Sequence, residues 1–439
     1  MAPPARFVSF QQRTRQAFPL RLGMRWSLDR MQRRSAEEIV RYQERRLRLL
    51  VRLAASRSDF YRDWFAGAGV DPASIRTLAD LEKLPLLDRS HLVHRPERFL
   101  VYPRLLTWVA HSSGTSGQVV TVHRTPGSSV YELASLQRQW SWFDVPHRPR
   151  SLLLRSSDPD PEGAGVLTRE IPATRQLLVS SFRLGQEQLP QLVDQIRAFD
   201  PQVVEGWPSS ITILASLLRE RGERLPVRAV ITSSEVMTVE QLTLMREVFD
   251  GPVVDHYGQT ERVVMAGACE AGGYHEFPDY GIVELLPVEG REDRWEIVGT
   301  PLHNWGFPLF RYRTGDEVGP RPTAPCPCGR AFPLLGKIDG RVEDSFTAAN
   351  GRPLPLPSVV LDDLVGLREV QVAQLAPGCF EFRLVPGTGA DTSAAEEQAR
   401  RNVEKYFGPD QTVTFRVMSE IPREGNGKLR AAVRLSAPS

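Results

Sequence analysis

Long apolar segments are absent from this sequence of 439 residues. No window approaches the roughly 20 consecutive apolar residues that a membrane-spanning helix needs, and the arginine-rich start lacks the apolar core of a secretory signal. Excess charge is absent as well, because 55 basic and 53 acidic residues leave a formal net charge of +2. A balanced charge gives no reason to expect a nucleic-acid or membrane-surface partner. We therefore expect a cytoplasmic enzyme with no membrane span.

Cysteine is scarce, and the four cysteines are too few and too unevenly spread for a disulfide framework. Five residues separate Cys269 from His275, and Cys326 and Cys328 follow in the segment CPCGR. Three thiols and one imidazole form the Cys₃His set that zinc accepts in closed structural sites. This grouping predicts structural Zn²⁺, and the alternative is unrelated cysteines beside a surface histidine. We interpret Cys379 as an inert core thiol.

Lysine is also scarce, because only four of the 55 basic residues are lysine. The chain therefore uses arginine almost wherever a positive charge is needed. A lysine ammonium group is a compact and mobile point charge, whereas the arginine guanidinium is a rigid planar fork. A lysine in a glycine-rich loop is thus a candidate for chemistry, and Lys428 in PREGNGKLR meets this description.

The length permits two or more domains with a large buried core. Composition divides the chain into a large N-terminal domain over residues 1–341 and a small C-terminal domain over residues 342–439. Residues 1 to about 100 are expected to be helical, and a capping box of Ser35 and Glu38 marks the start of one helix. We predict an α/β fold, with mixed and parallel sheets flanked by helices in the large domain and an α+β arrangement in the small one.

Within the C-terminal domain the pattern predicts a hairpin around Gly378, followed by a helix that begins with a cap at Ser393 and Glu396. The strand TVTFRV and the loop that carries Lys428 come after this helix.

Strands and helices alternate between residues 190 and 262, which predicts a parallel sheet with right-handed crossovers. Polar clusters follow three of these strands directly, namely WPSS (207–210), SSE (233–235) and YGQTE (257–261). Ligands of open α/β sheets bind outside the carboxyl ends of the strands. We therefore expect the three loops to share one ligand crevice.

The segment HSSGTSG (111–117) lies between two alternating apolar runs, so a strand, a loop and a second strand are predicted. Its glycines allow the backbone to approach a ligand closely, and its hydroxyl groups suit phosphate oxygens. It is not a Walker loop, because the GK[ST] ending and the following helix are missing. A serine- and glycine-rich surface turn is the alternative.

Six motifs occur in an order that resembles the adenylate-forming superfamily of acyl-CoA synthetases, peptide-synthetase adenylation domains and luciferases. They are SSGTSG (112–117), SSE (233–235), HYGQTE (256–261), PLFRYRTGD (308–316), GRVED (340–344) and PREGNGK (422–428). The phenylacetate-CoA ligase-like branch, with its coenzyme F390 synthetase and capsule-biosynthesis types, is the most similar, and the resemblance spans nearly the whole chain. It implies a ligase that uses ATP and Mg²⁺ to form an acyl-adenylate and then passes the acyl group to a thiol, with CoA favoured.

The resemblance also implies roles for individual residues. Thr260 would contact the α-phosphate, Glu261 would bind Mg²⁺, and Lys428 on a mobile C-terminal domain would bridge the α-phosphate and the substrate carboxylate. Glu343 falls at the hinge of that domain, although an exposed charged linker is the alternative there. The remaining residues would form the nucleotide site. Tyr257 would lie against adenine, Asp316 would accept both ribose hydroxyls, and Arg341 would bind nearby. The other cofactor-binding residues would be Ser112, Ser113, Gly114, Thr115, Ser116 and Gly117 at the phosphates, with Ser234, Glu235 and Gly258.

This chain departs from the family pattern at two places. Gln118 and Val119 stand where many relatives carry lysine and proline, so the γ-phosphate contacts are expected either to be weaker or to come from an arginine. SFTAANGRPLPLP follows GRVED in place of a glycine- and asparagine-containing segment that helps to receive CoA, so the acceptor stays open.

The substrate is expected to be a small aryl or acyl carboxylic acid, and Trp207, Ser210 and Trp305 are candidates for its pocket, with core packing as the alternative. Two other functions stay open. One is the same adenylation chemistry with an amine or a carrier-protein thiol as acceptor, and the other is a non-catalytic nucleotide-binding relative. A homodimer is left open.

Overall fold

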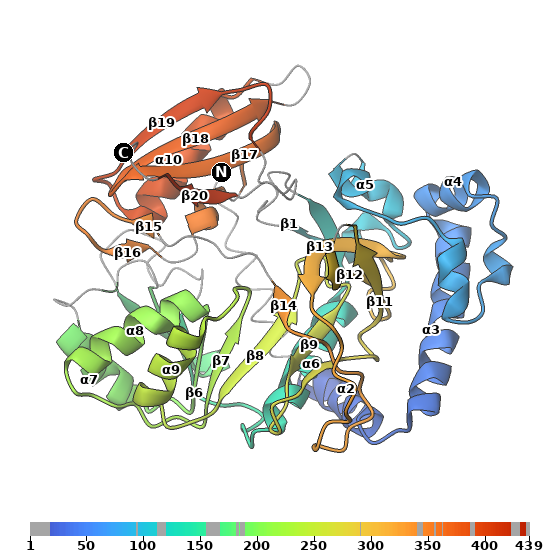
Figure 1. The fold of residues 1–439 in the computed structure, drawn as a ribbon, viewed down its shortest axis with the longest axis horizontal. Coiled ribbons are helices and arrows are strands. Elements are labelled where there is room, and N and C mark those ends of the chain that lie inside the picture. Colours follow the sequence, from blue (N-terminus) through green and yellow to red (C-terminus); the bar gives the residue numbers. More distant parts are fainter. Residues whose placement is uncertain are drawn as a thin grey trace.

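A computed structural model describes residues 18–93, 95–111, 120–154, 167–180, 184, 189–289, 291–339, 346–354, 357–361, 363–386, 391–422 and 431–435. Figure 1 shows three groups of elements. The N-terminal helices lie on one side, two sheets built from the central part of the sequence lie next to them, and the C-terminal elements form a group of their own. Among the helices described, none combines the length and the apolarity needed to cross a bilayer.

The N-terminal part is helical, as predicted. It contains α2 (Phe18–Met31), α3 (Ala36–Arg57), α4 (Asp59–Gly67) and α5 (Arg89–Val93), with short 3-10 turns between the last two. The capping box of α3 is confirmed, because the Ser35 hydroxyl accepts from the Glu38 amide while the Glu38 carboxylate accepts from the Ser35 amide. Short-range sequence signals of this kind locate helix starts because both partners lie within one turn.

The two strands predicted on either side of the HSSGTSG segment are also present. Strands β1 (Trp108–His111) and β2 (Thr121–Arg124) pair antiparallel, with His111 opposite Thr121. Helix α6 (Pro126–Ser141) follows, and its first turn is capped by Thr125.

The main sheet has eight strands in the order β10-β9-β8-β7-β6-β3-β5-β4. Its strands are β3 (Ser151–Leu154), β4 (Thr168–Ile171), β5 (Gln176–Val179), β6 (Val203–Gly206), β7 (Ala229–Ser233), β8 (Val253–Gly258), β9 (Met265–Ala268) and β10 (Tyr274–Glu276). The run from β5 to β8 is parallel, whereas the pairs β4/β5, β8/β9 and β9/β10 are antiparallel. Helices α7 (Leu189–Phe199), α8 (Pro208–Glu220) and α9 (Val239–Val248) alternate with β5 to β8, as the sequence predicts.

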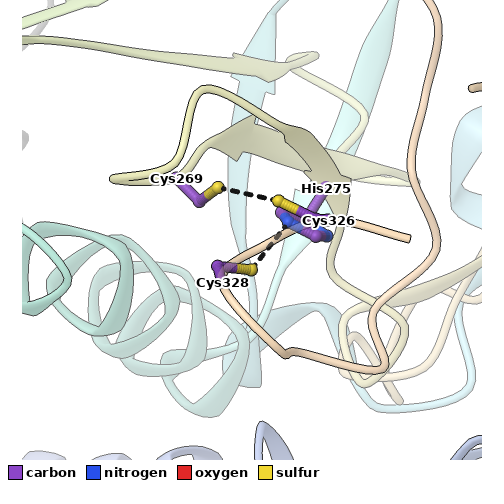
Figure 2. A group of neighbouring side chains, drawn as sticks. All are labelled: Cys269, His275, Cys326 and Cys328. Carbon is purple, nitrogen blue, oxygen red and sulfur yellow. Dashed lines mark hydrogen bonds between the residues drawn. The ribbon is translucent and has the colours of Figure 1, made fainter. Parts of the chain in front are cut away.

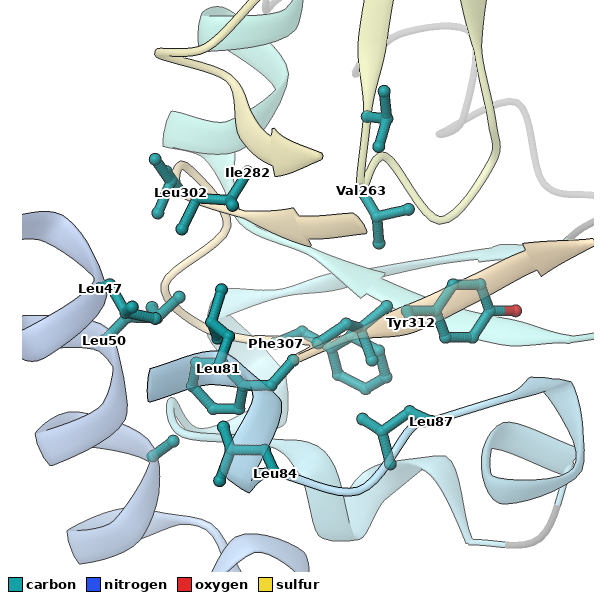
Figure 3. Close-up of a cluster of buried hydrophobic side chains, with 14 of the residues drawn as sticks. Leu47, Leu50, Leu81, Leu84, Leu87, Val263, Ile282, Leu302, Phe307 and Tyr312 are labelled. Atoms are coloured by element: carbon teal, nitrogen blue, oxygen red, sulfur yellow. The ribbon is translucent and has the colours of Figure 1, made fainter. Parts of the chain in front are cut away.

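A second, antiparallel sheet packs between the main sheet and the N-terminal helices (Figure 1). It consists of β11 (Gly281–Val288), β12 (Arg291–Pro301), β13 (Tyr312–Val318) and β14 (Ile338–Asp339). One apolar cluster joins it to the helices: Leu47 and Leu50 of α3 and Leu81, Leu84 and Leu87 of the following segment meet Phe307 and Tyr312 (Figure 3). This shared core fixes the N-terminal helices against the strand that carries FRYRTGD.

The elements after residue 345 form their own sheet. Strands β17 (Leu367–Ala376), β18 (Cys379–Pro386), β19 (Thr412–Val417) and β20 (Ala432–Arg434) are ordered β19-β18-β17-β20, with helix α10 (Ser393–Phe407) packed on them. Strands β15 (Phe346–Thr347) and β16 (Pro353–Leu354) form a short hairpin beside this sheet (Figure 1). The predicted domain boundary at residues 341 and 342 lies outside the described residues.

Two local predictions in this C-terminal part are wrong. Ser393 is the first helical residue and not the cap, because its amide and hydroxyl both donate to the carboxylate of Asp391, which precedes the helix. Glu396 instead accepts a hydrogen bond from the Thr392 hydroxyl. Cys379 is half-buried at the start of β18 rather than in the core, because it stands on the partly exposed face of an alternating strand.

Candidate active site

The polar loops that the sequence places in one crevice follow adjacent parallel strands. Gly206 at the end of β6 pairs with Thr232 of β7, and Ser233 at the end of β7 pairs with His256 of β8. The Glu235 carboxylate accepts hydrogen bonds from the Ser209 amide and hydroxyl, both at 2.8 Å. The loop after β7 is therefore tied to the start of α8. Ser234 is exposed and has a φ of 74°, so it lies at the turn of this loop.

Tyr257 and Asp316 join the third loop to the second sheet. The Tyr257 hydroxyl donates to Asp316 Oδ2 at 2.8 Å, although the residues are 59 positions apart. Burial, and secondly the Asp316 charge, raise the pKa of Tyr257 well above its ordinary value. The hydroxyl consequently stays protonated and donates, which keeps the Asp316 carboxylate at the edge of the aromatic ring. Gly258, the next residue, is exposed at the end of β8.

A β-bulge directs Asp316 toward Tyr257. Val298 of β12 pairs with Arg313 of β13, but Glu296 pairs with Glu317. Two residues along β12 therefore correspond to four along β13. Gly315 adopts a φ of 75° within this bulge and donates its amide to Glu296 Oε1 at 3.2 Å. Bulges re-aim side chains and frequently require glycine at the left-handed position. The RTGD sequence thus has a local structural cause.

Glu261 is buried, and its carboxylate is held by Tyr312 of β13. The Tyr312 hydroxyl donates to Glu261 Oε1 at 3.0 Å, and Arg89 Nη1 of α5 lies 4.0 Å from the same oxygen. Burial raises the pKa of Tyr312 well above its usual value, with the Glu261 charge as the second cause. A buried carboxylate with a fixed orientation is a suitable hard-oxygen ligand for Mg²⁺.

A basic layer underlies Thr260. Arg124, at the end of β2, donates from Nη2 to the Thr260 carbonyl at 2.5 Å. Arg262, with a φ of 56°, donates to the Ser129 hydroxyl at 3.0 Å and lies 3.5 Å from the Glu132 carboxylate of α6. Burial lowers the pKa of Arg124 to about 9, and Arg262 contributes to this shift.

Four residues of this site, Arg89, Arg124, Arg262 and Tyr312, are not marked by the sequence motifs described above. Tyr312 could have been predicted from the sequence. It lies four residues before Asp316 in an expected strand, and alternate residues of a strand point to the same face. The arginines carried no comparable signal, since arginine is the common basic residue of this chain. Arg124 contacts a carbonyl 136 positions away, which no local pattern indicates.

The four residues of the predicted metal set lie together (Figure 2). Cys269 follows β9, His275 belongs to β10, and Cys326 and Cys328 come from the connection between β13 and β14. The Cys269 and Cys326 Sγ atoms are 3.5 Å apart, and Cys328 Sγ is 3.3 Å from His275 Nε2. All four candidate ligand atoms lie within 4.8 Å of one another.

These distances fit tetrahedral zinc. Ligand bonds of about 2.3 Å to sulfur and about 2.05 Å to nitrogen give edges of roughly 3.8 Å between sulfurs and roughly 3.6 Å between sulfur and nitrogen. His275 Nδ1 donates to the Phe332 carbonyl at 2.9 Å, which leaves the Nε2 lone pair for a metal. A Cβ at Gly273 would lie 2.7 Å from Cys326 Sγ, so glycine is needed for the loop to pass beside the cluster.

The three candidate residues for the acid pocket differ in their burial and in their neighbours. Trp207 is buried in an apolar cluster whose other members all come from elements after residue 345, and Ser210 is fully buried on α8. Trp305 is half-buried, with the Arg46 guanidinium 4.6 Å above its ring.

Several candidate residues lie outside the described residues. They are Ser112, Ser113, Gly114, Thr115, Ser116 and Gly117 of the first loop, Arg341, Glu343 and Lys428.

No family model matches the chain. Among curated proteins, it is 27% identical to a phenylacetate-coenzyme A ligase of Thermus thermophilus, over 91% of this chain and 97% of that protein. It is 19% identical to the protein CapK of Staphylococcus aureus, over 91% and 90% of the two chains. Among solved structures, a 2-hydroxyisobutyryl-CoA ligase in complex with 2-HIB-AMP and CoA, in the thioesterification state, matches with a TM-score of 0.58 and 18% identity, over 92% of each chain. The fold likeness thus extends over nearly the full length of both proteins.

Proposed function

Because the chain belongs to the adenylate-forming superfamily, in its phenylacetate-CoA ligase-like branch, we propose that it activates a carboxylic acid with ATP and transfers the acyl group to CoA. One observation supports this proposal at the level of individual residues. Two residues of HYGQTE are bonded to the same strand, because the Tyr257 hydroxyl donates to Asp316 and the Glu261 carboxylate accepts from the Tyr312 hydroxyl. Two motifs far apart in sequence therefore form one wall at the carboxyl end of β8.

In the proposed nucleotide site, the Tyr257 ring lies against adenine and Asp316 accepts hydrogen bonds from the ribose hydroxyls. A carboxylate has lone pairs for several donors, so Asp316 can accept from Tyr257 and from ribose together. Ser234, Glu235 and Gly258 are assigned to the rest of this nucleotide site, and Arg341 is assigned to the neighbourhood of the ribose.

In the proposed first half-reaction, a carboxylate oxygen of the acid forms a bond to the α-phosphorus while the bond from this phosphorus to pyrophosphate breaks. Hydroxyls and amides of residues 112–117 hold the phosphates, and Thr260 contacts the α-phosphate. Glu261 would hold Mg²⁺, which would supply positive charge against the charge that builds on the phosphoryl oxygens. The Arg124 contact with the Thr260 carbonyl keeps this turn in place.

Lys428 is proposed to bridge the substrate carboxylate and the α-phosphate, which neutralises two anions that otherwise repel one another. In the second half-reaction the CoA sulfur bonds to the acyl carbon and AMP leaves. Rotation of the C-terminal elements about Glu343 exchanges Lys428 for the surface used in this step, so that one cavity serves two reactions. An amine or a carrier-protein thiol is the alternative acceptor, favoured by the SFTAANGRPLPLP segment that departs from the family pattern.

We further propose that Cys269, His275, Cys326 and Cys328 hold one structural zinc ion. All four protein positions of a closed site are filled by these ligands, so the ion would stabilise the fold and take no part in the reaction. Its effect would be to fix the long connection between β13 and β14 to the β9/β10 hairpin.

Carboxylate-dependent exchange of pyrophosphate into ATP tests the proposed function, with a panel of aryl and fatty acids followed by CoA or amines. Lys428→Ala is expected to abolish exchange and to leave ATP affinity unchanged. Lys405→Ala is the matched control, because Lys405 lies in the same C-terminal part, on α10, with its ammonium group 4.8 Å from the Tyr406 ring. Normal exchange in Lys428→Ala would remove this lysine from the mechanism. Absence of exchange by the wild type with every acid would favour a non-catalytic nucleotide-binding protein.

A further inference from the structure

Strand β6 carries a glutamate among the apolar residues of the main sheet. Glu205 stands one residue before the end of this strand and is only 4% exposed. Within the ranges that the structure describes, its carboxylate takes part in no hydrogen bond and no ion pair. Buried charges in proteins are normally paired, because taking a charge out of water is costly. Among the described residues, this carboxylate therefore lacks the partner that its burial requires.

The neighbours of Glu205 in the strand show which face of the sheet it points to. Val204 packs in the apolar cluster that contains residues of α7, α8 and α9. Val203 packs instead in the cluster that contains Trp140 of α6. Alternate residues of a strand point to the same face, so Glu205 shares the α6 face with Val203.

The side chains beside Glu205 on this face are apolar. Glu205 pairs with Ile231 of β7, and Ile231 pairs with Val254 of β8. Both residues belong to the same buried cluster as Trp140. The indole N–H of Trp140 is itself buried without an acceptor, so it does not bond to Glu205. These neighbours supply no counter-charge for the carboxylate.

Glu205 also lies near the ligand-binding end of the sheet. The loop WPSS begins two residues later, and ligands of open α/β sheets bind outside the carboxyl ends of the strands. Gly258 ends β8, two strands away and four residues beyond Val254, which is level with Glu205. Two strand spacings and a rise of four residues place the Cα atoms of Glu205 and Gly258 roughly 16 Å apart. A group bound at Glu205 would thus be remote from the reacting carboxylate, which the proposed function places at the turn after Gly258.

We propose that Glu205 binds a protonated amine of the carboxylic acid substrate, at the end remote from the reacting carboxylate. This inference rests on the proposed function and specifies the class of acid. An ammonium group supplies both the positive charge and the N–H donors that a buried carboxylate needs. A divalent metal ion needs several oxygen ligands, so a single carboxylate does not make a site for one. An α-amino acid is not expected to reach Glu205, because its amine lies next to its carboxylate.

Acids of matched shape, with and without an amine, test this assignment. The pairs are 4-(aminomethyl)benzoate with 4-ethylbenzoate and 6-aminohexanoate with heptanoate, each measured by calorimetric binding and by carboxylate-dependent pyrophosphate exchange. The wild type is expected to favour the amine of at least one pair by about 10- to 100-fold, as for a hydrogen bond between charged groups. Glu205→Gln is expected to lose this preference, because the amine binds more weakly while the neutral acid is unaffected.

Two further variants separate this role from a structural one. Glu247→Gln is the matched control and is expected to keep the preference, because Glu247 is 51% exposed on α9. Without ligand, Glu205→Leu is expected to unfold at a higher temperature than the wild type, because it removes a buried charge. A lower unfolding temperature would show that Glu205 stabilises the fold, and would contradict the inference.

Equal use of the amine and the neutral acid of both pairs by the wild type would overturn the inference. An equal loss for both kinds of acid in Glu205→Gln would overturn it too. Failure of the proposed function gives a different result, because no acid then supports pyrophosphate exchange by the wild type. In that case, calorimetric binding of an amine that is lost in Glu205→Gln would still support the amine site, and absence of such binding would overturn it.

Discussion

Arg138 of α6 and Asp279 form a buried ion pair. Because the pair is buried, breaking it is expected to lower the free energy of unfolding considerably. Both side chains are fully buried, and the guanidinium donates to both carboxylate oxygens, at 2.5 and 3.0 Å. The Arg138 guanidinium also lies 4.9 Å from the ring centre of Phe277 and 5.0 Å from that of Phe332. Since Phe332 also accepts from the metal-set residue His275, this pair connects α6 to the candidate zinc site.

Replacing only one partner leaves an uncompensated charge in the interior. Arg138→Met is expected to lower the free energy of unfolding by about 3 to 5 kcal/mol, because Asp279 then stays buried without its cation. For a unit of about 340 residues, an unfolding entropy of roughly 0.7 kcal/mol/K converts this loss into a fall of about 4 to 7 °C in Tm. The double variant Arg138→Met/Asp279→Leu is expected to recover most of the loss, since an apolar pair removes the desolvation penalty.

Urea denaturation of the wild type, both single variants and the double variant measures the coupling between the two residues. Arg224→Met is the matched control, because Arg224 and Asp250 form an ion pair at 2.7 Å with side chains 62% and 51% exposed. Loss of such an exposed pair is expected to cost less than about 1 kcal/mol. A double variant whose loss equals the sum of the two single losses would refute the reasoning, because independent residues behave in that way.

Two further predictions concern metal and pH. Elemental analysis is expected to find one zinc ion per chain. Cys379→Ser should retain the ion, whereas Cys326→Ser should lose it and should unfold at a lower temperature. Absence of zinc from metal-replete wild-type protein would contradict the site. Burial raises the pKa of Asp255 from 3.8 to about 6, so its contribution to stability is present below pH 3.8 and is lost as pH rises through 6. Asp255→Asn is thus expected to raise the free energy of unfolding by up to about 3 kcal/mol at pH 8 and by little at pH 4, as measured by urea denaturation. A difference that does not vary with pH would contradict this assignment.

Sequence patterns predicted the elements whose determinants are local. The start of α3 depends on Ser35 and Glu38 within one turn, and the alternation of α7 to α9 with strands follows from periodic apolar residues. The cap at Ser393 failed for a related reason, because Asp391 competes for the same amide at an equally short distance. Local signals therefore determine that a helix exists more reliably than they determine its first residue.

Contacts between distant segments were predictable only where a rare residue type marks them. Cysteine is rare here, so Cys269 and Cys326 could be joined across 57 positions, and the structure brings them to 3.5 Å. Arginine is abundant, so nothing distinguished Arg124 or Arg262 from the arginines of exposed helix faces. The information content of a residue type, and not its chemical importance, limited what the sequence alone could assign.

HYGQTE and FRYRTGD are linked by hydrogen bonds between their side chains. Without Asp316, the half-buried Tyr257 hydroxyl would lose a charged acceptor, and without Tyr312, Glu261 would lose the donor that orients it. Each motif therefore stabilises the other. Because Asp316 reaches Tyr257 through the bulge at Gly315, a change of Gly315 to a residue with a Cβ would strain the backbone at a φ of 75° and disturb both halves of the wall at once.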